Sequence, residues 1–292
     1  MTAPCPAALV ERCRVPPGEA VRLDDHDPAD RMGLSKADAE AMLAAGAERL
    51  SVLHGQLFAQ RAWSALLVLQ GMDTSGKDGA IKRLAAGLNP QGLRVTSFNK
   101  PNTEERSHDF LWRIHRALPP RGTVGVFNRS HYEDVLVPRV EPGALAGLGL
   151  PPSLVGPDIW TRRLGAIVGF ESTLAHQGTV QAKVFLHLSR DEQRKRLLAR
   201  LDDPGKAWKF DPSDFAARDR WAEYRLAYEA AMGATATAAA PWFIVPADSK
   251  PVARALVQAI LQVTMEGLDL RMPPLSPERL AQMADARRQL EA

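Results

Sequence analysis

The sequence predicts an α/β protein with three layers, in which a parallel five-stranded sheet is flanked by helices. Two observations support this fold class. Short apolar runs alternate with segments of helical periodicity along most of the chain. The run 65–69 is uniformly apolar, as in a parallel strand that is covered on both faces. With 292 residues and 45% hydrophobic content, the chain can bury a large core as one domain with extensions.

The composition indicates in which compartment the protein works, but it says little about its function. The net charge of +3 is compatible with a polyanionic partner but does not identify one. The two cysteines, Cys5 and Cys13, lack metal-ligand spacing and suit a reducing compartment. No apolar stretch is long enough to span a bilayer, and the N-terminus has no signal-peptide pattern. We therefore expect a soluble, cytoplasmic protein without membrane contact.

Residues 65–79 carry the strongest motif. The apolar run 65–69 reads as a buried strand, Gly71 and Gly76 bound a loop that includes Thr74, and a helix starts at Lys77. Phosphate oxygens need several backbone N–H donors together, and a tight loop on a helix N-terminus supplies them. Glycine lets that backbone approach closely, and the lysine adds a positive charge. The pattern predicts a phosphate-binding P-loop and therefore a P-loop kinase fold.

Two acids accompany this loop. Asp78 stands where a P-loop usually has Ser or Thr to hold Mg²⁺, and Asp73 lies inside the loop. Carboxylates beside bound phosphate are costly unless a cation lies between them, so we expect Asp73 to face Mg²⁺. Asp78 has two open interpretations: a metal-facing or phosphate-site residue, or an acid that favours the N-terminus of its helix.

The remaining elements follow in order, and we divide the chain into three parts: 1–60, an N-terminal arm and a helix packed on the core; 61–270, the kinase domain with a lid at about 189–220; and 271–292, a C-terminal helix. The predicted strands are 65–69, 94–98, 123–127, 180–188 and 242–245, and the predicted helices include 35–59, 104–118, 158–176, 214–231 and 252–265. Residues 141–156 are rich in Gly, Pro and Leu and are predicted to form a loop.

A polar cluster follows the third strand, where ligands collect in such sheets. Arg129, Tyr132, Glu133 and Asp134 are therefore candidates, with Glu133 and Asp134 as a second magnesium-holding position opposite the P-loop. We interpret His131 as structural, because transfer to a phosphate acceptor needs little proton chemistry. Further candidates for phosphate or nucleotide binding are Lys100, Arg113 and Arg139.

A basic segment follows the fourth strand. Arg196 and Arg200 lie four residues apart on one helix face, and Lys206 and Lys209 follow among aromatic residues. Three interpretations compete: a lid whose arginines close over reacting phosphates, a solvated helix face, and a nucleic-acid surface. The position after a sheet strand favours the lid, and we expect no nucleic-acid partner.

These motifs, taken together, resemble the polyphosphate kinase 2 family over about residues 50–268. The stretches that carry the resemblance are Leu69–Ile81, Asn89–Gly92, Gly125–Val137, Ser189–Gln193, Lys206–Phe210, Ala240–Trp242 and Pro246–Lys250. Several long motifs in the expected order make the resemblance specific. An aspartate directly after the P-loop lysine, unusual among nucleotide-binding P-loops, is normal in this family.

The resemblance implies a thymidylate-kinase-like fold with a helical lid. It also implies reversible, Mg²⁺-dependent phosphoryl transfer between inorganic polyphosphate and nucleotides. The sequence of the motif His131–Asp134 is most similar to that of the subgroup whose members phosphorylate both nucleoside mono- and diphosphates (class III). Matching positions imply that Asp73 and Glu133 or Asp134 hold Mg²⁺, that Lys77 and Arg129 contact phosphates, and that Arg196 and Arg200 are lid arginines. Family members tend to form dimers or tetramers.

One enzyme rival shares the same fold: an ATP-dependent nucleoside monophosphate kinase. A P-loop switch or nucleic-acid-binding protein is a rival from another class, which the lid arginines disfavour. The sequence leaves open the base preference, the preferred polyphosphate length and the preferred acceptor.

Overall fold

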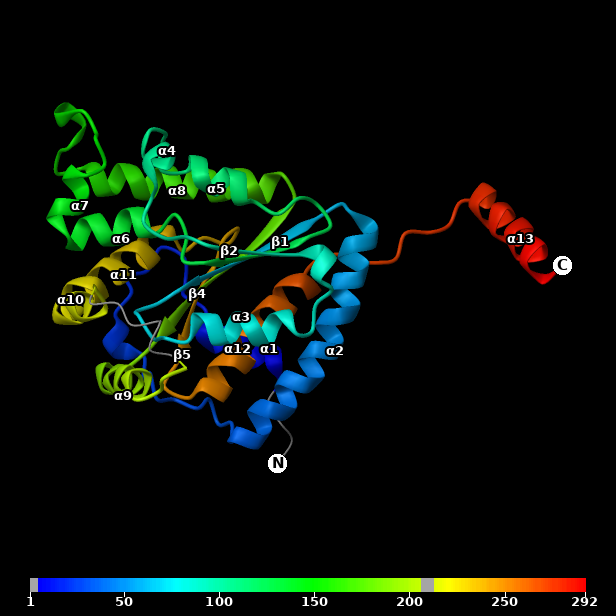
Figure 1. Ribbon diagram of the computed structural model, residues 1–292, viewed down its shortest axis with the longest axis horizontal. Helices are drawn as coiled ribbons and strands as arrows, with labels where there is room; N and C mark the ends of the chain where they lie inside the picture. Colours follow the sequence, from blue (N-terminus) through cyan, green and yellow to red (C-terminus); the bar gives the residue numbers. More distant parts are fainter. Residues whose placement is uncertain (1–4, 206–212) are drawn as a thin grey trace.

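The computed structural model describes residues 5–205 and 213–292, and its centre is a five-stranded parallel sheet (Figure 1). The strands are β1 Ser64–Gln70, β2 Leu93–Ser97, β3 Val124–Asn128, β4 Thr179–His187 and β5 Trp242–Pro246. Their order is β2-β3-β1-β4-β5, and every neighbouring pair is parallel. The P-loop strand β1 is therefore central, and the carboxyl ends of β1 and β3 meet, with Leu69 opposite Asn128.

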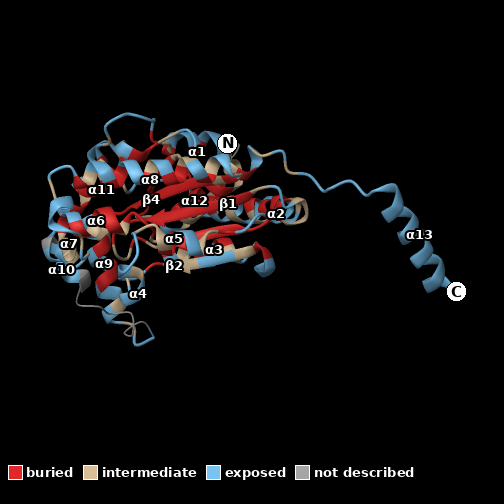
Figure 2. Ribbon diagram, turned by 90° about the horizontal axis from the view of Figure 1, so that it is seen from above, coloured by how far each residue is buried: buried red, intermediate tan, exposed pale blue. Residues whose placement is uncertain are grey.

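Helices cover both faces of this sheet, which confirms the three-layer prediction (Figure 2). One face carries α1 Pro6–Cys13, α2 Lys36–Gln60, α3 Lys77–Ala85 and α12 Lys250–Glu266. The other carries α5 Trp112–Ala117, α6 Glu133–Val140, α8 Ile159–His176 and α11 Trp221–Thr235. The shorter helices α4 Thr103–Arg106, α7 Pro142–Ala146, α9 Arg190–Leu201 and α10 Ser213–Asp219 lie around one end, and α13 Pro277–Glu291 follows the domain.

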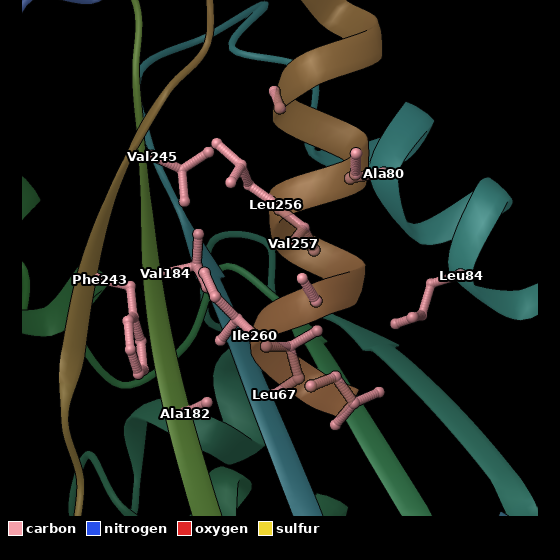
Figure 3. Close-up of a cluster of buried hydrophobic side chains, with 14 of the residues drawn as sticks. Leu67, Ala80, Leu84, Ala182, Val184, Phe243, Val245, Leu256, Val257 and Ile260 are labelled. Atoms are coloured by element: carbon pink, nitrogen blue, oxygen red, sulfur yellow. The ribbon is translucent and has the colours of Figure 1, made fainter. Parts of the chain in front are cut away.

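The apolar strands are explained by this two-sided cover. Figure 3 shows α12 presenting Leu256 and Ile260 toward Leu67, Val184 and the neighbouring strands. Each such side chain is almost fully buried, and burial of one contributes about 1.5–3 kcal/mol. This packing fixes the sheet, and with it the loops at its carboxyl edge.

Three predicted elements are corrected by the structure. The expected helix 104–118 is broken into α4 and α5, because Asp109 accepts a hydrogen bond from the backbone of Leu111 and competes with helix formation. The expected loop 141–156 contains α7. The expected helix 214–231 is two helices, α10 and α11.

The two ends of the chain differ. Residues 5–15 are not an extended arm, because α1 packs against α12 and Val15 donates a backbone hydrogen bond to Trp242. At the other end, all of α13 is exposed, and it projects away from the body of the domain (Figures 1 and 2). Within the described parts of the chain, none of the helices combines the length and the apolar character needed to cross a membrane.

Candidate active site

The loop between β1 and α3 has the backbone that a P-loop requires. Gly71 has φ +150°, and a Cβ there would lie 2.9 Å from the carbonyl of Leu186. Gly76, at the helix N-cap, has φ +107°, which is strained for any side chain. Thr74 adopts φ +64° although it is not glycine, and such strain concentrates at functional sites.

Lys77 folds back over this loop. Its Nζ donates to the carbonyl of Gly71 at 2.7 Å and lies 3.3 Å from that of Met72, so the ammonium sits inside the loop. Burial lowers the pKa of Lys77 from 10.5 to about 8, and the neighbouring charge of Arg129 adds to this effect. Nearby Asp73 and Glu133 act in the opposite direction. A buried cation of this kind is prepared to receive an anion.

Arg129, directly after β3, joins the two acids predicted to hold a metal. One terminal nitrogen of its guanidinium donates to Asp73 Oδ1 at 2.6 Å, and the other donates to Glu133 Oε2 at 3.0 Å. The backbone of Arg129 has φ +64° and its N–H donates to the carbonyl of Leu69, which fixes where the side chain starts. Asp73 and Glu133 thus converge on one cationic position.

The same pair of carboxylates fits a magnesium site. Mg²⁺ prefers oxygen ligands and is commonly held by one or two carboxylates, with water and substrate phosphates completing its shell. The described residues contain no cluster of three or more His, Cys, Asp or Glu side chains able to hold a metal. A site at Asp73 and Glu133 would therefore need phosphate or water oxygens as further ligands.

Asp134 does not join this pair, which corrects one of the predicted metal positions. Its Oδ2 accepts from the guanidinium of Arg113 at 3.0 Å, and both side chains are buried. Arg113 also donates to the carbonyl of Asn99 at 2.8 Å. Burial raises the pKa of Asp134, although Arg113 opposes this effect. Consecutive residues of a helix point about 100° apart, so Glu133 and Asp134 face different sites.

Arg113 and Asp134 instead belong to a second pocket of about 260 Å³, which we call the α5–α8 pocket. Arg163 lies over the ring of Phe110 at 4.8 Å from its centroid and donates to the carbonyl of Asp134. The other residues lining the pocket include Pro101, Leu148, Leu150, Leu154, Ile159 and Ala166. Charged residues Glu105, Arg106, Asp109 and Arg162 line it as well, but apolar atoms make up most of its exposed surface.

Tyr132 is the second correction, because it cannot contact a phosphate where it lies. Its side chain is fully buried, and its hydroxyl lies within hydrogen-bond distance of Glu171 Oε1 and Thr235 Oγ1, at 2.9 and 2.8 Å. His131 is buried beside it, with Nε2 at 3.2 Å from Glu171. This agrees with the structural interpretation of the histidine.

Arg196 is bound to the backbone of the P-loop at the wall of the cleft. Its guanidinium donates to the carbonyls of Thr74 and Ser75 at 3.0 and 3.2 Å, and to those of Ala247 and Asp248. It is 8% exposed. In this conformation Arg196 connects α9 to the P-loop and to the β5–α12 turn, which differs from the predicted contact with the reacting phosphates.

A cleft of about 820 Å³ opens above the P-loop, and we call it the P-loop cleft. Among the described residues, seven basic side chains and three acidic ones line it. The basic residues are Lys77, Arg129, Lys195, Arg196, Arg200, Lys250 and Arg254, and the acidic residues are Asp73, Asp78 and Glu192. Buried Thr74 Oγ1 and Asn128 Oδ1 find no hydrogen-bond partner within the described residues. The excess of positive charge and these side-chain oxygens suit a polyanion with a hydrated cation.

The other predicted residues are distributed as follows. Asp78 lies in the first turn of α3 and accepts from Asn128 Nδ2 at 2.9 Å, so its carboxylate is held at the cleft wall. Lys100 and Arg139 are exposed and line neither cavity. Lys206 and Lys209 lie outside the described residues.

Sequence reasoning missed several contributors to this site. Gln193 is fully buried on α9, and its amide donates to the carbonyl of Asp73 at 3.1 Å. The sequence feature that could have indicated this role is the position of Gln193 at the end of the motif Ser189–Gln193, one turn after the N-cap of a helix. Lys250 and Arg254 enter the cleft from α12, which is more than 170 residues from the P-loop in sequence. Only the fold brings them together.

A parallel sheet with a P-loop at its centre, a lysine inside that loop and a basic cleft above it define a P-loop phosphotransferase. Comparison with known proteins identifies its family: residues 33–272 match the model of polyphosphate kinase 2, and the chain belongs to that family.

Three similar proteins support this assignment. An ADP-polyphosphate phosphotransferase of Rhodopseudomonas palustris is 44% identical over 88% of this chain and 89% of its own length. An AMP/ADP-polyphosphate phosphotransferase of Meiothermus ruber is 42% identical over 90% of this chain and 96% of its own. The crystal structure of polyphosphate kinase 2 from Arthrobacter aurescens TC1 superimposes with a TM-score of 0.88 at 42% identity, covering 98% of both chains.

Proposed function

We propose that this protein transfers phosphoryl groups reversibly from inorganic polyphosphate to nucleoside mono- and diphosphates, converting AMP to ADP and ADP to ATP, with Mg²⁺ as cofactor. The observation that carries the proposal is the pairing of two unlike cavities at one edge of the sheet. The P-loop cleft is large and basic, whereas the α5–α8 pocket is small and mostly apolar.

The P-loop cleft suits the polyphosphate chain. Its volume of about 820 Å³ exceeds what one phosphate group needs, and its basic residues come from α3, α9, α12 and the segment directly after β3. A chain of phosphates gathers its binding free energy from many such contacts, each of them weakened by salt.

The α5–α8 pocket suits the nucleoside. Its volume of about 260 Å³ and its ring contact at Phe110 match a flat base with part of its sugar. Asn99 lines the P-loop cleft, and its carbonyl accepts from Arg113 on the floor of this pocket. A nucleotide with its base here would direct its phosphates along the Asn99 loop toward Lys77.

The chemistry asks little of proton transfer, because the terminal phosphate of the acceptor is already an anionic nucleophile. Phosphoryl transfer depends mainly on alignment and on charge placed around the transferring group. Lys77 and Arg129 supply that charge, and the P-loop N–H groups orient the phosphate oxygens. His131 has no role in this scheme, because Glu171 holds it in the core.

Asp73 and Glu133 are the residues that would hold Mg²⁺. When bound, the metal neutralises phosphate oxygens so that two polyanions can approach each other. The two carboxylates would hold the metal, and the Gln193 amide restrains the backbone of Asp73 by donating to the Asp73 carbonyl.

A donor assay tests the function directly. Purified protein with ADP, polyphosphate and Mg²⁺, but without ATP, should form ATP above the level of an ADP-only control, and AMP should yield ADP. Production of ADP from AMP only when ATP is supplied would instead favour the ordinary monophosphate kinase.

We also infer that the protein assembles as a dimer or tetramer. The 15-residue helix α13 has no buried residue, and Leu280, Met283 and Leu290 are all more than half exposed. An isolated helix of this length is marginal in water, so packing against another copy would stabilise it. Light scattering should give a mass at least twice that of the chain, and deletion of 271–292 should lower it.

A further inference from the structure

The guanidinium of Arg129 lies where a metal held by Asp73 and Glu133 would lie. Its two terminal nitrogens bind one oxygen of each acid, at 2.6 Å for Asp73 and 3.0 Å for Glu133. The side chains of Asp73 and Glu133 are 21% and 14% exposed, and that of Arg129 is 40% exposed. The two carboxylates therefore face a cation that already occupies the space between them.

Two cations cannot share this position. A divalent ion at the same carboxylate oxygens would lie within a few ångströms of the guanidinium, where like charges repel each other and both cations would compete for the same oxygens. The opposite arrangement, with neither cation present, leaves the two acids facing each other. The site therefore has two stable arrangements, one with the arginine and one with the metal.

The arginine can leave without moving the backbone. The φ of +64° and the hydrogen bond to Leu69 hold the main chain of Arg129, while its long side chain lines the P-loop cleft and has solvent on one side. Turning about its side-chain bonds would carry the guanidinium from the carboxylates into the cleft, where the proposed polyphosphate lies.

We propose that Arg129 is an internal counter-cation that a divalent metal displaces, so that metal binding releases the guanidinium to bind a phosphate. The proposal rests on the metal and phosphate roles given under the proposed function, and adds a competition between them. Metal and polyphosphate binding then favour each other, because both draw Arg129 away from Asp73 and Glu133, and this coupling is reciprocal.

The test measures metal affinity in the absence of any substrate. Mn²⁺, which replaces Mg²⁺ and is followed by electron paramagnetic resonance, is titrated into the full chain without nucleotide or polyphosphate. Arg129→Met removes the competitor, and we expect at least about tenfold tighter Mn²⁺ binding, since charge-assisted hydrogen bonds to both acids are lost. Arg129→Lys keeps the charge without the two-pronged contact and should give an intermediate affinity.

Arg83→Met is the matched control, because it removes an exposed arginine from α3 outside the cleft. It should leave the Mn²⁺ affinity within about twofold of the wild type, as expected for a screened surface charge. A second measurement has the opposite sign: with saturating Mn²⁺, which releases the guanidinium in the wild type, polyphosphate should bind Arg129→Met more weakly than the wild type.

Unchanged or weaker Mn²⁺ binding by folded Arg129→Met overturns the proposal, as does the absence of detectable binding by either protein. Thermal unfolding verifies that the variants are folded, and Arg129→Lys gives the same test if Arg129→Met is not. If the wild type transfers phosphate from polyphosphate but the Mn²⁺ affinities do not separate, only this inference fails. If the wild type transfers none, the proposed function fails instead.

Discussion

Two ionic clusters both include residues of the segment that follows β3, and they behave as opposites. The core cluster surrounds Lys183 on β4, whose Nζ donates to Glu171 Oε2 at 2.6 Å and to the Tyr132 hydroxyl at 3.0 Å. It also donates to the carbonyl of Thr235 at 2.8 Å. The cleft cluster consists of Arg129 with Asp73 and Glu133.

Exposure is what separates them. The side chains of Lys183 and Glu171 are 1% and 2% exposed, whereas that of Arg129 is 40% exposed. Burial alone would raise the pKa of Glu171, but Lys183 and His131 outweigh it and leave the pKa below its ordinary value. Lys183 and Glu171 therefore keep each other as partners, since ions from solvent do not reach either side chain. Arg129 is open to solvent, so it can exchange its carboxylate partners for a ligand, as a binding site requires.

The difference also explains the order of residues after β3. Arg129 lines the cleft and binds Glu133, while His131 and Tyr132 between them enter the core and are held by Glu171. The core cluster therefore anchors the turn from which the cleft cluster extends. Residues 129–133 thus contribute both to the stability of the fold and to the proposed active site. Substitutions in the two clusters should change stability and activity separately.

The largest effect is expected at Lys77. Lys77→Met removes the charge against the transferring phosphate and should lower the transfer rate by about 10²–10⁴. Stability should not fall, because burial already disfavours the charged form of this lysine. Initial rates with polyphosphate and ADP, together with thermal unfolding, check both parts. A folded variant that keeps more than about half of its activity would show that the P-loop assignment is wrong.

The core cluster should give the converse result. Lys183→Met leaves Glu171 buried without its cation and should lower the free energy of unfolding by about 3–5 kcal/mol, as measured in urea. The double variant Lys183→Met/Glu171→Gln removes both charges and should recover much of this loss. If Lys183→Met were as stable as the wild type, the division between a structural and a functional cluster would not hold.

The metal acids come next. Asp73→Asn and Glu133→Gln should each raise the Mg²⁺ concentration needed for half-maximal activity by at least about tenfold and lower the maximal rate. Asp78→Asn should do less, because its carboxylate is bound to Asn128. Titrations of Mg²⁺ against the three variants rank them directly. An unchanged curve and rate for Asp73→Asn would leave Asp73 only a structural role in the loop.

The smallest effect concerns pH. The pKa of Lys77 is lowered from 10.5 to about 8 chiefly by burial, so in the free protein its ammonium loses its proton as the pH rises through this value. Polyphosphate affinity should therefore fall by up to about tenfold between about pH 7 and pH 9, since about nine tenths of the lysine is then neutral. The same lowered pKa makes folding stability increase between about pH 8 and 10.5, because the unfolded chain binds more protons.

Arg is always protonated, so Lys77→Arg should flatten the affinity profile whatever its effect on rate. Isothermal titration with polyphosphate in EDTA at several pH values gives the measurement. A wild-type profile that is flat across this range would contradict the assignment of Lys77 as a phosphate contact.

Local sequence was sufficient for the fold class and for the central motif. The buried strands were recognised from their apolar runs, and the P-loop from Gly71, Gly76 and Lys77 between a strand and a helix. These features depend on a few consecutive residues, and their backbone requirements are met by neighbours in the chain. The same holds for the start of α2, where Ser35 caps the helix at the boundary of the predicted range 35–59.

Only the tertiary structure decided which way each polar residue faces. Glu133 and Asp134 are equivalent as sequence, yet one meets Arg129 and the other meets Arg113. The sequence predicts that Arg196 contacts the phosphates, but the turn after β5 supplies carbonyls that hold its guanidinium against the backbone. Such choices depend on partners far along the chain, because a charged side chain that is buried must satisfy its hydrogen bonds where the fold provides them.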